Sequence, residues 1–287
     1  MIDLALSILS SSLIFIIFKG FEPMRVQTLN AIIFNYITAC TVGLFLYEGK
    51  VDPGQIVEAS WAWGPPAMGV LFICIFNLMA ITSQRVGVSV TSVATKMSLA
   101  IPVLLGVFLY GDRLSLLQGI GILLALTAVY LASLKEGGIK IGFKQLLLPL
   151  LVFLGSGVID ASIKYFEHRH LREAEIPLFS AMVFGCAALS GLVFVGIRSL
   201  KKPMKLAPRD VLGGIILGVP NFFSIFFLIR ALRWDRFNSA ATFTLNNVGV
   251  VLFSTLLAIV LFRERLSQKN WGGVVLAVLG IILVALF

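Results

Sequence analysis

The sequence predicts an all-α integral membrane protein of ten transmembrane helices, built as two inverted five-helix repeats. Three observations predict this fold. First, 59% of the 287 residues are hydrophobic and 13% are charged, which is more apolar surface than a soluble core of this size buries. Second, long apolar stretches alternate with polar connectors along the whole chain. Third, the chain contains an internal repeat.

Each expected span is an apolar stretch of roughly 17 to 25 residues, long enough to cross a ~30 Å hydrocarbon layer. The spans lie near residues 2–18, 29–47, 65–84, 88–110, 116–134, 145–165, 177–197, 211–232, 239–262 and 268–286. We expect the first to be retained, because it lacks the basic start and the small-residue cleavage site of a signal peptide. The connectors are too short for a soluble catalytic domain, so function is expected within the bundle.

The repeat appears in two pairs of segments. SSLIFIIFKGFE, from residue 11, matches SGVIDASIKYFE, from residue 156. YGDRLSLLQGIGILLALTAVYL, from residue 110, matches FRERLSQKNWGGVVLAVLGIILVAL, from residue 262. The repeats are therefore residues 1–138 and 139–287. Because five spans are an odd number, the second repeat enters the membrane from the opposite side, as in many secondary transporters. Gene duplication also occurs in proteins that transport nothing, but ten spans without a soluble domain favour transport.

The segments GDRLSLLQGIGILLALTAVYL and RERLSQKNWGGVVLAVLGIILVAL, each closing one half, resemble a known signature. It is the GERLS…Q…G signature of the drug/metabolite transporter superfamily, in its ten-helix EamA-like members. Two positions depart from it, with Asp112 at the usual glutamate and Arg263 at the usual glycine. The resemblance implies export or exchange, without ATP, of a small metabolite such as an amino acid, a drug-like cation or a nucleotide sugar. It also implies a bacterial-type inner membrane.

Asp160 is the one acid deep within an expected span. A charge in the hydrocarbon layer costs at least ~2.5–3.5 kcal/mol, so it requires a partner or a function. Lys164 follows four residues later, the spacing of an ion pair on one helix face. Asp160 is therefore either half of a structural pair or a carboxylate that couples transport to protons or anchors a substrate amine.

Lys96 lies about seven residues, roughly 10 Å, into its span, with no acid at helical spacing. It could bind a substrate carboxylate or phosphate, pair with a carboxylate of another helix, or titrate. Alternatively, its stem reaches along the wall of a cavity toward water. Direct contact with Asp160 is not expected, because the two residues differ in depth by about seven helical positions, some 10 Å.

Uncharged polar residues at membrane depth complete the candidate substrate site. They are Asn35, Tyr36, Asn77, Asn221, Asn246 and Asn247. In the repeat register Thr95 falls on Asn247, which favours a shared central cavity beside Lys96. Each asparagine could equally serve to join helices.

Prolines and glycines within the spans indicate local geometry. Pro102 and Pro220 remove backbone hydrogen bonds and predict kinks. The pair Gly214 and Gly218 is typical of close helix packing, as are the glycine clusters in the closing segments.

Several classes of site are not expected. The excess of 23 Lys and Arg over 14 Asp and Glu lies in interhelical loops and does not indicate nucleic-acid binding. Cys40, Cys74 and Cys186 are isolated within spans, which favours packing over a disulfide or metal site. His168 and His170 lie on a short charged connector that is typical of a solvated turn. We therefore expect no metal and no cofactor.

Orientation follows from the basic residues. Loops 1–2, 3–4, 5–6, 7–8 and 9–10 hold fourteen and the opposite loops eight, which with Lys96 makes 23. The positive-inside rule then predicts that the richer side is cytoplasmic and both termini are outside, whereas the resembling family usually places them inside.

These observations favour a secondary active transporter of a small polar metabolite such as an amino acid, not an enzyme. We expect an exporter or exchanger that works by alternating access around a central cavity, as a monomer or weak dimer in the bilayer. Protons are a candidate coupling ion. The alternative is a membrane enzyme acting on a lipid or isoprenoid substrate, for which the sequence shows no HExxH or Asp-rich motif and no paired intramembrane carboxylates.

Overall fold

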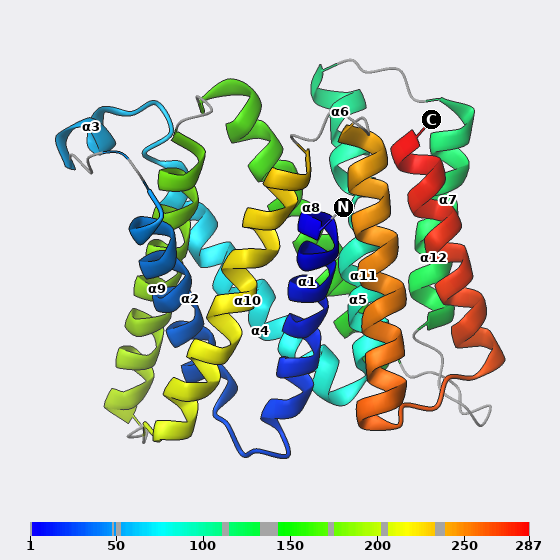
Figure 1. The fold of residues 1–287 in the computed structure, drawn as a ribbon, viewed down its shortest axis with the longest axis horizontal. Helices are drawn as coiled ribbons and strands as arrows, with labels where there is room; N and C mark the ends of the chain where they lie inside the picture. Colours follow the sequence, from blue (N-terminus) through cyan, green and yellow to red (C-terminus); the bar gives the residue numbers. More distant parts are fainter. Residues whose placement is uncertain are drawn as a thin grey trace.

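The computed structural model describes residues 2–47, 49, 53–110, 115–132, 143–171, 175–201, 206–232 and 239–286. Within these ranges the secondary-structure elements are helices that run side by side across a single slab (Figure 1). They are α1 Ile2–Phe21, α2 Thr28–Phe45, α3 Pro53–Glu58, α4 Gly64–Arg85, α5 Val88–Met97, α6 Ala100–Tyr110, α7 Leu116–Ala132, α8 Phe143–Arg169, α9 Ile176–Lys201, α10 Pro208–Leu232, α11 Ser239–Phe262 and α12 Gln268–Leu286.

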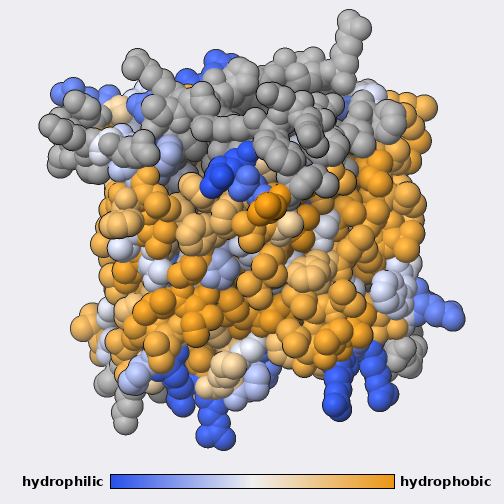
Figure 2. Space-filling view, in the orientation of Figure 1, coloured by the Kyte–Doolittle hydropathy of each residue, from blue (hydrophilic) through white to orange (hydrophobic). Residues whose placement is uncertain are grey.

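Eight stretches of the described chain are long and apolar enough to cross a membrane, with α5 and α6 together forming one of them over Val88–Leu105. The helices α7 and α12 are shorter apolar helices. Figure 2 shows an apolar belt around the visible face, with hydrophilic side chains projecting below it. The chain is therefore a multi-pass membrane protein.

The expected span 88–110 is interrupted in the structure. Pro102 has no N–H to donate to the carbonyl of Ser98, four residues earlier, so the helical ladder cannot continue there. The Ser98 carbonyl instead accepts the N–H of Ile101 at 2.9 Å. The chain ends α5 at Met97 and begins α6 at Ala100. The sequence predicts a kink at this proline, and the structure has a break.

Two other features of the fold bear on the sequence predictions. The short helix α3 lies between spans and is not among the expected elements. Pro220 lies inside α10, which continues through it. Four half-buried phenylalanines follow Pro220 and stack on one another in the pairs Phe222/Phe226 and Phe223/Phe227.

Glycines allow the closest helix contacts. A Cβ atom on Gly218 of α10 would lie 2.7 Å from the backbone oxygen of Asn35 in α2. A Cβ atom on Gly273 of α12 would lie 2.5 Å from the backbone nitrogen of Ala132 in α7. Because only a residue without Cβ fits at such distances, the prediction that these glycines serve helix packing is confirmed.

The serine of the repeated RLS motif precedes a helix in both copies. The Ser115 hydroxyl accepts the N–H of Gln118 at 3.1 Å, and the Gln118 side-chain oxygen accepts the N–H of Ser115 at 3.0 Å. Ser267 and Asn270 make the same reciprocal contacts at 3.2 and 2.9 Å. This is a capping box at the first turns of α7 and α12. Asn270 also donates to the Ala132 carbonyl at 2.7 Å, which ties α12 to the end of α7.

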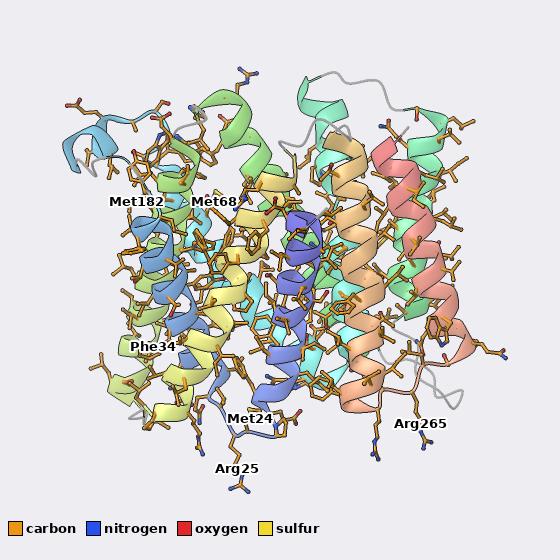
Figure 3. The ribbon with its side chains drawn as sticks, viewed as in Figure 1. Met24, Arg25, Phe34, Met68, Met182 and Arg265 are labelled. Carbon is orange, nitrogen blue, oxygen red and sulfur yellow. The ribbon has the colours of Figure 1, made fainter. Side chains whose placement is uncertain are left out.

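One end of the bundle, called here the lower face, contains the turn between α1 and α2 and the connection from α11 to α12. Arg25 and Arg265 project from it (Figure 3). The fully buried carboxylate of Asp210 lies at the start of α10 near this face. It accepts the N–H of Gln27 at 2.8 Å and the Asn30 amide at 3.1 Å, so it holds the start of α2.

A second carboxylate caps α5 near the same face. Glu264 accepts the N–H of Val88 at 2.9 Å and the hydroxyl of Ser89 at 3.3 Å. A negative charge at this position complements the positive end of the helix dipole. Gly87, which precedes α5, has φ +141°, a conformation that L side chains rarely adopt.

Candidate functional site

The break between α5 and α6 lies against α8, where it meets Asp160. The hydroxyl of Ser98, within the break, donates to Oδ2 of Asp160 at 2.9 Å. Ser98 is fully buried. The interruption of the helix therefore places a hydrogen-bond donor on an intramembrane carboxylate.

Asp160 faces the interior of the bundle. A Cβ atom on Gly155 would contact Ile75 of α4, and one on Gly157 would contact Ile101 of α6. Since successive helical residues are rotated by about 100°, Asp160 lies on the arc of α8 between these two contacts, on the side toward the centre. The opposite arc carries the exposed apolar residues Leu147, Leu151, Leu154 and Val158. The Asp160 side chain is itself exposed.

Lys96 lies two residues before Ser98 and is half-buried. Within the described part of the chain, its ammonium makes no hydrogen bond and no ion pair within 4.0 Å. It nevertheless lies close to Asp160 along the chain's fold, because Ser98, two residues later, contacts that carboxylate. The two residues therefore share a region without forming a direct pair, but the predicted difference in depth of about seven helical positions is wrong, because Ser98, two residues after Lys96, contacts Asp160.

The predicted pair of Asp160 with Lys164 lies outside the described residues, because the Lys164 side chain is not among them. The same holds for His168 of the charged connector and for Asp112 of the repeated motif.

Buried hydroxyls border the Lys96–Asp160 region. Those of Thr95, next to Lys96, and Ser156, one turn before Asp160, have no hydrogen-bond partner among the described residues. Ser12, near the middle of α1, is in the same situation. Leaving such groups unpaired costs about 1–3 kcal/mol each, so a polar interior here is expensive for stability alone.

Three of the predicted asparagines lie in contacts between helices. The amide of Asn221 donates to the side-chain oxygen of Asn35 at 3.1 Å, which joins α10 to α2. The hydroxyl of Ser7 donates to the side-chain oxygen of Asn246 at 3.0 Å, which joins α1 to α11. The Asn35 amide nitrogen is buried and has no partner among the described residues. The structure uses these amides mainly to join helices.

Tyr36 and Asn77 also have partners within the protein. The Tyr36 hydroxyl donates to the Phe72 carbonyl at 3.0 Å, and Asn77 donates to the Ile73 carbonyl of its own helix at 2.8 Å. Asn247 is buried, and its side chain makes no hydrogen bond to the described residues. Of the six uncharged candidates, Asn247 is the one whose whole side chain makes no hydrogen bond to the described residues.

The sequence reasoning missed Ser98, Asp210 and Glu264. Ser98 could have been found, because it lies four residues before Pro102, where the proline frees a carbonyl. The acids gave no local signal, because their partners lie 183 and 176 residues away in the chain. Among the described residues there is no cluster of three or more potential metal ligands, and the three cysteines are free.

Comparison with known proteins gives a relative in sequence and a likeness in fold. No family model matches the chain. An uncharacterized protein of Haemophilus influenzae is 29% identical over 279 residues, covering 95% of this chain and 94% of that protein. A protein of known crystal structure has a TM-score of 0.62 and 18% identity, covering 99% of this chain and 96% of that one. The second likeness shows the fold alone.

Proposed function

We propose that the protein is a secondary active transporter, an exporter or exchanger, of a small polar metabolite. The observation that carries the proposal is the Lys96–Asp160 region, where two ionisable side chains of opposite sign lie within the bundle and, among the described residues, form no direct ion pair. Each charge costs at least ~2.5–3.5 kcal/mol in the hydrocarbon layer. A substrate that contacts them during its passage accounts for that cost, whereas a purely structural role would be better served by a direct pair.

The helix packing supports an origin in two inverted halves, residues 1–138 and 139–287. Helices at the same place in each half pack on one another, as in α2 with α9, α5 with α11 and α7 with α12. Contacts of α1 with α10 and α11 correspond to contacts of α8 with α4 and α5. Figure 1 also shows α2 and α9 running in opposite directions, as do α7 and α12. These pairings support a two-fold axis in the membrane plane.

The repeated closing segments support membership of the drug/metabolite transporter superfamily. Their RLS motif makes a capping box in both halves, and Glu264 caps a helix of the other half. The broken helix supports transport as well, because secondary transporters form midplane sites from discontinuous helices. Alternating access would open the Lys96–Asp160 region to each side in turn.

Counterflow in proteoliposomes tests the proposal. The purified protein would be reconstituted and screened with labelled amino acids, organic cations and phosphorylated metabolites. We expect saturable, ATP-independent flux of one class, abolished in Lys96→Ala and retained in Lys269→Gln, which removes an exposed charge at the start of α12.

Normal flux in Lys96→Ala would show that Lys96 does not contribute to the substrate site. Absence of flux for every class, together with turnover of a lipid or isoprenoid substrate, would replace the proposal with the membrane enzyme.

A further inference from the structure

We infer that Glu264 forms a latch that closes the candidate site toward the lower face, and that α5 separates from it when that face opens. The latch is the pair of hydrogen bonds that Glu264 makes with the start of α5. The inference rests on the proposed function and concerns how access to the Lys96–Asp160 region is controlled.

A polar stripe runs along α5 from the lower face to Lys96. It consists of Ser89, Ser92 and Lys96, whose spacing of three and four residues puts them on one face of the helix. The Ser92 hydroxyl donates to the Ser89 carbonyl at 3.0 Å. Both serines are buried, whereas Lys96 is half-buried. At 1.5 Å per residue the stripe is about 10 Å long, and its buried lower part separates Lys96 from the lower face.

Glu264 covers the lower end of the polar stripe. Its carboxylate accepts the Ser89 hydroxyl at 3.3 Å and the Val88 N–H at 2.9 Å. A Cβ atom on Gly87 would lie 3.2 Å from both carboxylate oxygens, so the connection from α11 to α12 is seated directly on the start of α5. The lower face therefore cannot open along the stripe while these hydrogen bonds persist.

Burial distinguishes Glu264 from Asp210, the other acid that joins the two halves near this face. Asp210 is fully buried, so water cannot take the place of its protein donors. Glu264 is half-buried, so water can replace Val88 and Ser89 as hydrogen-bond donors at a lower cost. Of these two contacts between the halves, that of Glu264 is the one suited to form and break during a cycle.

The helix α5 is bounded by an interruption at each end. Gly87, with φ +141°, directly precedes it. At the other end α5 stops at Met97, and α6 begins at Ala100. Hinges are commonly a few residues at the ends of elements. The ten residues of α5 can therefore move as one unit, carrying the polar stripe with them, without bending α4 or α6.

Cysteine labelling tests the latch without requiring a known substrate. Ser92→Cys, in a protein whose three native cysteines are replaced by alanine, reports access to the polar stripe. Membrane vesicles are treated with an impermeant maleimide on the side from which a cysteine at Arg265 reacts. Glu264→Ala removes both hydrogen bonds of the latch and should raise the labelling rate at least about tenfold. Glu264→Gln keeps an acceptor oxygen but loses the charge, and should give a smaller rise.

Two controls accompany the labelling. Glu22→Ala changes an exposed acid in the turn between α1 and α2 at the same face, and should leave the labelling of Ser92→Cys unchanged. Ser7→Cys, fully buried near the start of α1, is the control reporter and should stay slow in Glu264→Ala. If Glu264→Ala does not elute as a single species in gel filtration, Ser89→Ala replaces it, since that change removes one hydrogen bond of the latch.

Cross-linking tests whether the latch must open for transport. A short, reducible bis-methanethiosulfonate would join cysteines at Ser89 and Glu264 in the same background. We expect counterflow to fall at least about tenfold and to return after reduction. The control joins cysteines at Leu131 and Gly272, where a Cβ atom on Gly272 would lie 4.0 Å from Leu131 Cδ1. Counterflow should persist there, because Asn270 already ties α12 to the end of α7.

The outcomes separate the latch from the proposed function. Unchanged labelling in both Glu264 variants, equal acceleration at Ser7→Cys, or full counterflow in the cross-linked Ser89–Glu264 protein would overturn the latch. Absence of counterflow for every class in the unaltered protein would overturn the proposed function, while the labelling rates would still decide whether Glu264 closes the lower face. Faster labelling of Ser92→Cys alone, with counterflow lost on cross-linking, would support both.

Discussion

Ser98 is the residue through which the helix break acts on the site. Its hydroxyl donates to the Asp160 carboxylate. Ser98→Ala removes the donor without adding volume. A hydrogen bond to a charged group is worth about 1.5–3 kcal/mol, so we expect at least about a tenfold rise in the substrate KM in counterflow. Ser162→Ala is the matched control, because that hydroxyl donates to the Val158 carbonyl within α8. Equal KM values for the two variants would separate Ser98 from substrate binding.

Asn221 and Asn35 form a polar pair that we expect to stabilise the packing of α10 against α2. Asn221→Ala removes the donor to Asn35 and should lower the free energy of unfolding by about 1 kcal/mol. Asn35→Ala should cost a similar amount, and the double variant should cost less than the sum, because both remove one interaction. Thermal unfolding in detergent measures all three. If Asn221→Ala lost transport while its stability was unchanged, Asn221 would instead belong to the substrate site.

Arg263 adopts a left-handed conformation, with φ 52°, directly after the last residue of α11. The next N–H, from Glu264, reaches back to the Ala258 carbonyl at 3.3 Å, as in a helix end that favours glycine. This explains in physical terms why the resembling signature has glycine here. We expect Arg263→Gly to raise the free energy of unfolding by about 1 kcal/mol, while Arg265→Gly gives no gain. A fall in the unfolding temperature of Arg263→Gly would contradict this.

At the scale of elements, the start of α5 depends on two residues acting together. Gly87 has a φ of +141°, and Glu264 accepts the first N–H of the helix. Gly87→Ala should destabilise the protein by at least about 1 kcal/mol, because an L residue is strained at this φ. Gly196→Ala is the control, since a Cβ atom there meets no atom within 4 Å. Thermal unfolding of both variants distinguishes them, and equal unfolding temperatures would show that the strain is relieved elsewhere.

The elements also show why part of the fold could be predicted. Apolar length identifies a helix that crosses a bilayer, because every backbone group must be satisfied within the segment. The interruption at Ser98 follows from Pro102, whose missing N–H is a local property. In contrast, the sequence around Asp210 and Glu264 indicates only that they are charged loop residues. Their hydrogen bonds depend on helices from the other half, and no spacing along the chain indicates those contacts.

The residues of the candidate site differ in how clearly the sequence indicates them. Lys96 and Asp160 are conspicuous because charges are expensive at their depth. The asparagines are less informative, because an amide satisfies another helix as readily as a ligand. Their positions at mid-depth are compatible with substrate binding and with joining helices. Only the packing of α2 against α10 and of α1 against α11 distinguishes these two roles.

For the whole molecule, the sequence predicts that the lower face is cytoplasmic. We expect cysteines introduced at Arg25 or Arg265, in a protein whose three native cysteines are replaced by alanine, to react with an impermeant maleimide only from the cytoplasmic side. A cysteine at Glu58, in α3 at the other end of the bundle, should react only from outside. Labelling of intact cells and of inverted vesicles measures both. The reverse pattern would show that the termini are cytoplasmic.

Asp210 limits which parts of the molecule can move independently. Its buried carboxylate receives donors from the start of α2 and, through the Ala207 N–H at 3.2 Å, from the residue just before α10. Separating the starts of α2 and α10 would leave the buried Asp210 carboxylate without these hydrogen-bond donors and without access to water. We therefore expect the first turns of α2 and α10 to move together as one rigid body, although the two helices belong to different halves. In a transport cycle, the parts that move relative to one another would then not be the two repeats, because α2 and α10 would stay together on the same side of the moving interface.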